Sequence, residues 1–113
     1  YSLGQADMLE VANMGLHVAQ MTSRDAMRQC FAAVTTGPAE ILHLDGYGID
    51  VGCKADMVLL QAADPIEAIR LKATRLAVIK AGKVISRTTP RLATLDLPGR
   101  PSELDPSKVG PRG

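Results

Sequence analysis

The stretch Gly48-Ile49-Asp50-Val51-Gly52-Cys53-Lys54-Ala55-Asp56-Met57-Val58-Leu59-Leu60 begins as a turn-rich segment and ends in an uninterrupted apolar run. Gly52 can adopt the positive φ of a tight turn, and Asp56 can accept hydrogen bonds from turn amides. Ala55 is small enough to let the following strand start against a neighbouring layer. Four consecutive apolar residues at 57–60 predict a strand that is buried on both faces.

Downstream of this stretch, the chain carries signals for a helix and a hairpin. Asp64-Pro65 is a cap followed by a proline suited to the first helical turn, which predicts a short helix through about Leu71. Residues 76–80 and 83–87 are predicted strands, and Ala81-Gly82 between them is a two-residue hairpin signal. From Thr88 onward, proline is frequent and periodicity is lost. We expect an extended tail that is ordered only where it lies on other protein.

Upstream, residues Gln5 to Met21 predict a helix with an unusually narrow polar stripe. Its polar residues at 10, 13, 17 and 20 lie within an arc of about 80° at the 100° per residue of an α-helix. The rest of this helix is nearly all apolar, so it must be covered on most sides. The remaining sequence offers little to cover it with, which indicates missing protein.

A second helix is predicted after the cap Thr22-Ser23. Its apolar residues follow helical spacing, and we expect Gly37 to end it and Pro38 to open a short helix through Leu42. The apolar positions are Met27, Cys30, Phe31 and Val34.

Size and charge restrict the function. The 113 residues suffice for one small domain, and the net charge of +1 comes from interspersed charges of both signs. We therefore expect neither a nucleic-acid nor a membrane partner, and no apolar run approaches the roughly 20 residues of a membrane span. Cys30 and Cys53 fit free thiols in a reducing cytoplasm.

The sequence offers no catalytic or metal-binding constellation of its own. His17, His43, Cys30 and Cys53 lack metal-ligand spacing; we interpret His17 as a hydrogen-bonded structural histidine and His43 as solvated. No serine lies in a nucleophile elbow, and the glycines at 46, 48 and 52 do not form a phosphate loop. The acidic pairs Asp45/Asp50 and Asp7/Glu10 are typical of turns and helix surfaces.

The pattern at 48–60 resembles the C-terminal signature of the metal-dependent amidohydrolase superfamily. Two further pieces match in the same order: Thr36-Gly37-Pro38-Ala39-x-x-Leu42 and Val78-Ile79-x-x-Gly82-Lys83-Val84-Ile85. The resemblance covers roughly Tyr1 to Ser86 and leaves the tail outside. Tyr1-x-Leu3-Gly4, Met8-Leu9-x-Val11 and Met14-Gly15-Leu16-His17-Val18-x-Gln20 are similar to the cytosine deaminase branch of that superfamily.

The resemblance implies an α/β fold in which this chain is the C-terminal part of a TIM-barrel amidohydrolase. Residues 1–44 would be the last helices on the barrel, 45–87 the C-terminal strands of a small β-sandwich, and 88–113 a Pro-rich extended tail. Tyr1 and Leu3 would lie at the wall of the substrate pocket. A divalent metal ion of the zinc or iron type would be held by ligands outside this chain.

The implied parent enzyme deaminates a cytosine-like nitrogen heterocycle hydrolytically, releasing ammonia, and is a cytoplasmic homo-oligomer. We expect this segment to be inactive on its own, because it begins at Tyr1 without the catalytic residues, and to aggregate or to bind the missing barrel portion. Two alternatives stay open. One is a non-catalytic binding module that reuses the small sandwich, and the other is a different amidohydrolase, such as a hydantoinase-like or imidazolonepropionase-like enzyme.

Overall fold

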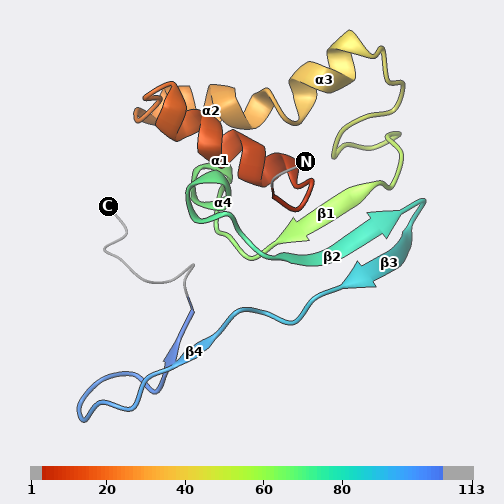
Figure 1. Cartoon of the computed structure of the whole chain (residues 1–113). Coiled ribbons are helices and arrows are strands. Elements are labelled where there is room, and N and C mark those ends of the chain that lie inside the picture. The colour runs from red at the N-terminus through yellow and green to blue at the C-terminus, as the bar shows by residue number, and fades with distance from the viewer. Residues whose placement is uncertain (1–3, 106–113) are drawn as a thin grey trace.

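The structure is a computed structural model that describes residues 4–105 of the chain. It contains both helices and strands, with a group of helices on one side and a small antiparallel sheet on the other (Figure 1). The helices are α1 (Met8–Val18), α2 (Arg24–Ala32), α3 (Thr36–Ile41) and α4 (Pro65–Leu71). The strands are β1 (Met57–Leu60), β2 (Arg75–Lys80), β3 (Lys83–Arg87), β4 (Ala93–Thr94) and β5 (Glu103–Leu104).

Three of the helices begin at a side-chain cap. Ser23 accepts a hydrogen bond from the amide of Ala26, and Asp64 accepts one from the amide of Glu67, which confirms both predicted caps. Asp7 caps α1 by accepting from the amide of Leu9 at 2.8 Å, so that helix begins later than the predicted Gln5. Within residues 4–105, no helix combines the length and the hydropathy needed to cross a membrane.

The prediction that Gly37 ends the second helix is wrong. The helix ends at Ala32, and a tightened turn follows in which the amides of Val34 and Thr35 bond to carbonyls three residues back, both at 3.2 Å. The Thr35 hydroxyl also donates to the carbonyl of Phe31. The chain has therefore left α2 before Gly37, which lies inside α3.

The three-stranded sheet has the order β1-β2-β3, and each neighbouring pair is antiparallel. Because β1 is an edge strand, Val58 and Leu59 are 46% and 57% exposed. The prediction of a strand buried on both faces is therefore wrong for the chain as described. Ala81 and Gly82 both have positive φ, 48° and 76°, as a tight hairpin turn between β2 and β3 requires, and this prediction is confirmed.

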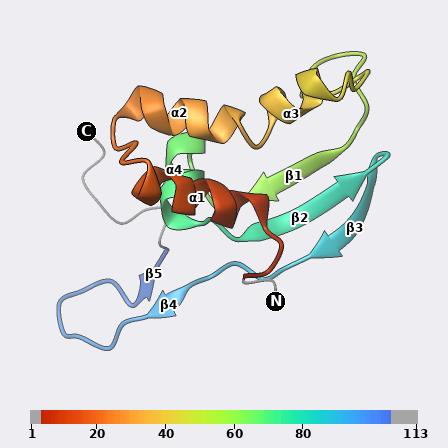
Figure 2. The same ribbon diagram turned by 45° about the horizontal axis from the view of Figure 1, so that its top comes forward.

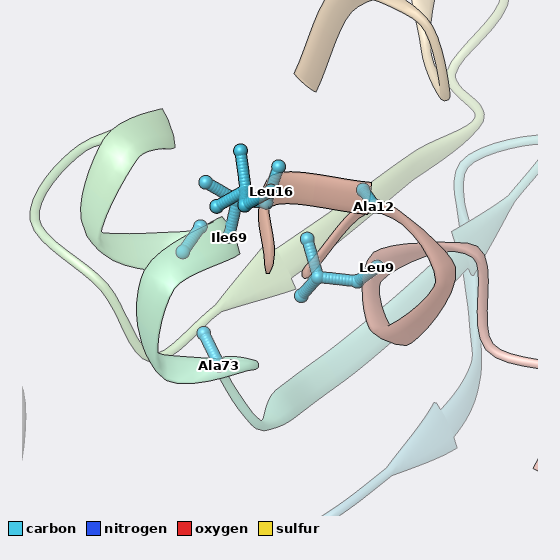
Figure 3. Packing of buried hydrophobic residues seen from close by; sticks show 6 residues of the cluster. Leu9, Ala12, Leu16, Ile69 and Ala73 are labelled. Carbon is cyan, nitrogen blue, oxygen red and sulfur yellow. The ribbon is translucent and has the colours of Figure 1, made fainter. Parts of the chain in front are cut away.

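The hydrophobic core lies between α1 and α4 (Figure 3). Leu9, Ala12 and Leu16 recur at helical spacing on α1 and pack against Ala68 and Ile69 of α4. Helix α2 and the turn after it add a partly buried layer with the four positions predicted from the helical spacing: Met27, Cys30, Phe31 and Val34. The core is small, and Ile69 is its one large side chain that is fully buried within the described residues.

The tail departs from the expectation of a purely extended segment. Strands β4 and β5 pair antiparallel, with Ala93 opposite Leu104 and Thr94 opposite Glu103, and the resulting hairpin projects beyond the end of the larger sheet (Figures 1 and 2). The amide of Leu95 donates to the carbonyl of Ser102 at 2.9 Å. The prolines at 98 and 101 lie in the connecting loop, where their lack of an amide hydrogen costs no ladder bond.

Candidate functional site

An open groove of about 600 Å³ lies between the helices and the sheet. In Figure 2, α1 and α2 lie to one side of β1 and β2, and the loop after α3 returns toward the sheet. Apolar side chains dominate the lining, and the charged residues Asp56, Arg75 and Lys80 border it. The apolar lining residues are Met8, Leu9, Phe31, Val34, Ile49, Met57, Val58, Leu60, Val78 and Ile79.

At one end of β2, Arg75 forms a two-pronged ion pair with Asp7. Its guanidinium donates Nη1–H to Asp7 Oδ2 at 2.6 Å and Nη2–H to Oδ1. These hydrogen bonds hold the pKa of the Asp7 carboxyl below its ordinary value, against the opposing effect of partial burial. The pair joins the N-terminus of α1 to the sheet across 68 positions of sequence.

At the other end of β2, Asp56 holds the β2–β3 hairpin. Its Oδ1 accepts the backbone amide of Ala81 at 2.8 Å, and its Oδ2 accepts Lys80 Nζ at 2.6 Å. The Ala81 amide, and then Lys80, lower the pKa of Asp56. The predicted role of Asp56 as an acceptor for turn amides is therefore confirmed, although the turn belongs to the hairpin 25 residues downstream.

The backbone preceding β1 has the conformation predicted from its glycines. Gly52 has φ +90°, and Ala55 lies at the hairpin, where its carbonyl accepts the amide of Gly82 at 3.0 Å. The two backbones lie close together here, since a Cβ built on Gly82 would lie 4.0 Å from the Ala55 Cβ. Residues 55 and 56 of this stretch thus act structurally, by fixing the hairpin against the start of β1.

The groove has the chemical character of a surface that packs against other protein, and no metal-binding cluster is found among the described residues. Within residues 4–105, no group of three or more His, Cys, Asp or Glu side chains could hold a metal ion. The two acidic groups described above, at positions 7 and 56, are each engaged by a basic side chain and a backbone amide. Cys30 and Cys53 are free thiols, as expected, and donate to the carbonyls of Ala12 and Tyr47.

The histidines occupy the positions expected of them. His17 Nδ1 lies 2.8 Å from the carbonyl oxygen of Asn13, which confirms a hydrogen-bonded structural histidine. His43 is exposed in the turn after α3 and has φ +51°. Neither ring is part of a cluster that could hold a metal among the described residues.

At Asn13, the polar stripe of α1 is less exposed to solvent than expected. Its Nδ2 donates to the carbonyls of Ile69 and Arg70 at 2.9 and 3.2 Å, and thus satisfies carbonyls at the C-terminal end of α4 that have no helical partner. The stripe therefore partly faces α4, and much of the uncovered surface of α1 is apolar. Its exposed apolar residues are Met8, Val11, Met14 and Val18.

Sequence reasoning missed two of the residues that tie the segments together. Asp7 precedes an apolar helix, which is an N-cap signal that could have identified it. Arg75 shows no such signal, because its partner lies far away in the sequence. The predicted pocket-wall residues, Tyr1 and Leu3, lie outside the described residues.

The arrangement has counterparts in known proteins. A family model described as "Amidohydrolase family" matches residues 1–87 of the chain. The chain belongs to the amidohydrolase family. Among curated amidohydrolases, N-isopropylammelide isopropyl amidohydrolase of Pseudomonas sp. (strain ADP) is 34% identical over 83 residues, which are 73% of this chain and 21% of the relative.

Solved amidohydrolase structures share the fold of this segment. 5-Methylcytosine deaminase from Klebsiella pneumoniae, liganded with phosphonocytosine, superposes with a TM-score of 0.75 at 33% identity over 84% of this chain. N-isopropylammelide isopropylaminohydrolase from Burkholderia multivorans ATCC 17616 superposes with a TM-score of 0.70 at 33% identity over 74% of this chain. The chain covers only 23% and 22% of these two structures. It therefore corresponds to less than a quarter of each.

Proposed function

We propose that this chain is the C-terminal scaffold segment of a metal-dependent hydrolase that deaminates a cytosine-like nitrogen heterocycle. The observation that carries the proposal is the match of residues 1–87 to the amidohydrolase family. Solved relatives at 33% identity, one a 5-methylcytosine deaminase and the other an isopropylaminohydrolase, support the reaction class. In that reaction water adds to a ring carbon, the C–N bond to the amino group breaks, and ammonia leaves as a carbonyl forms.

The described residues do not fit the divalent metal ion of the zinc or iron type that the family implies. They bring no ligand cluster together, and the carboxylates of Asp7 and Asp56 are committed to ion pairs. We therefore place the metal ligands and the proton-transfer groups in the part of the enzyme outside this chain. The role of residues 4–105 is to support that part, and no step of the reaction is assigned to them.

The apolar surface of the chain supports this scaffold role. Met14 and Val18 of α1 are 61% and 78% exposed, and the outer edge of β1 is unpaired within the described residues. Residues 1–44 would pack against a TIM barrel, and the strands within 45–87 would extend a small β-sandwich of the same enzyme. A binding module that folds independently would be expected to bury these side chains within itself.

The parent enzyme would bind its small heterocyclic substrate beside Tyr1 and Leu3, in a cytoplasmic homo-oligomer. To test the activity, the longest open reading frame that contains this chain is expressed, and the release of ammonia from cytosine and 5-methylcytosine and of isopropylamine from N-isopropylammelide is measured. We expect ammonia from at least one pyrimidine and none from the 113-residue chain alone. Release of isopropylamine alone would contradict the deamination of a cytosine-like ring and indicate an alkylamine hydrolase. Opening of a hydantoin or imidazolone ring would also contradict the proposal.

The pocket-wall assignment has its own test in the long form. We expect Tyr1→Ala and Leu3→Ala to raise KM for the heterocycle, because both remove apolar contact area. Ser2→Ala, in the same segment, is the matched control and is expected to leave KM unchanged. Equal KM values in all three variants would refute the assignment without touching the reaction class.

A further inference from the structure

The side-chain amide of Gln61 links the tail to the end of β1. Gln61 follows β1 directly, and its Nε2 donates to the carbonyl of Arg91 at 2.9 Å while its Oε1 accepts the Arg91 amide at 2.8 Å. The side chain thus pairs with both backbone groups of one tail residue, as a neighbouring β-strand would. The family match ends at residue 87, so this attachment holds a segment that lies beyond the matched region.

The same amide also reaches the far end of the tail hairpin. Gln61 Nε2 lies 3.3 Å from Oδ1 of Asp105, immediately after β5, while Arg91 lies two residues before the first residue of β4. Both ends of the β4–β5 hairpin therefore meet at a single residue. Gln61 is itself fixed by its backbone amide, which donates to the carbonyl of Thr74 at 2.9 Å.

Burial distinguishes the two sides of this contact. Gln61 is 9% exposed and is the one polar residue buried in the described part of the chain. Within residues 88–105, by contrast, all positions are exposed except Leu95, Leu104 and Asp105, which are partly buried. The tail is thus held mainly by hydrogen bonds to a buried amide and only slightly by apolar burial.

We propose that Gln61 is a docking site for the segment 91–105, which binds to it and leaves it as a unit while the helices and the three-stranded sheet stay folded. Few apolar contacts oppose release, which is typical of segments that open locally. Release removes the bonds that the Gln61 side chain makes to Arg91 and Asp105, which costs free energy wherever water does not replace them. That cost favours the docked state and couples the tail to the end of β1.

The test is amide hydrogen exchange on the full 113-residue chain, with residue-level readout at Arg91 and Leu95. The amide of Thr88, which donates to the carbonyl of Leu76 in β2, reports on the folded sheet. We expect Gln61→Leu to lower the protection of the Arg91 amide about tenfold or more and to leave that of Thr88 within about twofold. Gln29→Leu, at an exposed glutamine of α2, is the matched control and is expected to change neither amide.

A second variant leaves the buried residue intact. Arg91→Pro removes the amide that donates to Gln61 Oε1, and we expect the protection of Leu95 to fall while that of Thr88 is kept. If Gln61→Leu does not fold, this variant shows whether the tail leaves Gln61 while the sheet stays folded. The proposal is overturned if the wild-type Arg91 amide exchanges like that of an unfolded chain, or if Gln61→Leu leaves its protection unchanged. Loss of protection at Thr88 and Arg91 by the same factor would also overturn it, because the tail would then leave only when the sheet unfolds.

Discussion

Asp7 and Arg75 bring together the N-terminus of α1 and the start of β2. Asp7 uses its two oxygens both to cap the helix, through the amide of Leu9, and to accept both prongs of the Arg75 guanidinium. One carboxylate therefore sets where α1 begins and where it lies against the sheet. The exposed pair of Arg28 and Asp25, one turn apart on α2, joins no separate elements.

The first prediction separates the two roles of Asp7. Asp7→Asn keeps an oxygen for the cap but loses the charge, and we expect it to lower the free energy of unfolding by about 1 kcal/mol, since the Arg75 side chain is 37% exposed and water screens the pair. Asp7→Ala also removes the cap and should cost about 2 kcal/mol. Urea unfolding at about 1 μM chain, followed by circular dichroism, measures both.

Asp25→Asn is the matched control for this pair. Its partner Arg28 is 62% exposed, so we expect a change below about 0.5 kcal/mol. Equal losses of stability for Asp7→Asn and Asp25→Asn would mean that the Asp7–Arg75 pair does not fix α1 to the sheet.

The second prediction concerns the loss of stability at low pH. The pKa of Asp7 is lowered in the folded chain, chiefly by its hydrogen bonds from Arg75, relative to an ordinary value of 3.8. Its contribution to stability is therefore complete above that value and is lost as the pH falls through the lower, folded-state pKa. We expect the wild-type chain to lose more stability than Asp7→Asn between about pH 5 and pH 2. Parallel curves of unfolding free energy against pH for the two proteins would contradict this.

The third prediction pairs two glycines with opposite expected effects. Gly82 has φ +76° in the hairpin, so Gly82→Ala should destabilise by about 1 kcal/mol. Gly15 lies inside α1, where an added Cβ would meet Cys30 Sγ at 3.6 Å, an ordinary contact. Gly15→Ala should therefore stabilise by about 0.5–1 kcal/mol, because alanine is the better helix former. Thermal unfolding gives the sign of each change, and destabilisation by Gly15→Ala would show that the helices cannot accommodate one methyl group.

Local signals in the sequence were sufficient for much of the secondary structure. The caps at Ser23 and Asp64, the turn at Ala81-Gly82 and the apolar face of α2 depend on residues a few positions apart, and all are confirmed. The errors arose where distant partners decide the outcome. Whether 57–60 is a central or an edge strand depends on which strands flank it, and four apolar residues look alike in both cases.

The contacts that hold the candidate site together were harder to predict for the same reason. Arg75 bonds to Asp7, which lies 68 residues away in the sequence, and Gln61 bonds to Arg91, which lies 30 residues away. No periodicity or motif connects such residues, because a polar side chain gives no signal of its partner's position in the chain. Asp56 was partly predictable, since an acid after a turn is expected to accept amides, but its partner Ala81 was not.

The fourth prediction tests that assignment of Asp56. Asp56→Ala removes the acceptor of the Ala81 amide, and we expect that amide to exchange faster and the β2–β3 hairpin to loosen. Asp56→Asn retains an oxygen for the amide while losing the charge that attracts Lys80, so its exchange should stay closer to wild type. Equal exchange of Ala81 in all three proteins would show that the hairpin does not depend on this side chain.

The last prediction concerns the apolar surface of the isolated chain. Val58 and Leu59 are exposed on β1, an edge strand whose outer side is unpaired within residues 4–105, and such edges favour association between chains. We therefore expect the 113-residue chain to self-associate as its concentration rises above about 10 μM, as seen by light scattering.

Leu59→Lys should reduce this association, because a charge on an edge strand opposes strand pairing between molecules. Ser86→Lys adds the same charge on exposed β3 and is the matched control. If association depends on the β1 edge, the first variant suppresses it and the second does not. A chain that stays monomeric and unfolds cooperatively at high concentration would instead mean that this edge needs no cover, and would remove the main physical support for further sandwich strands paired with it.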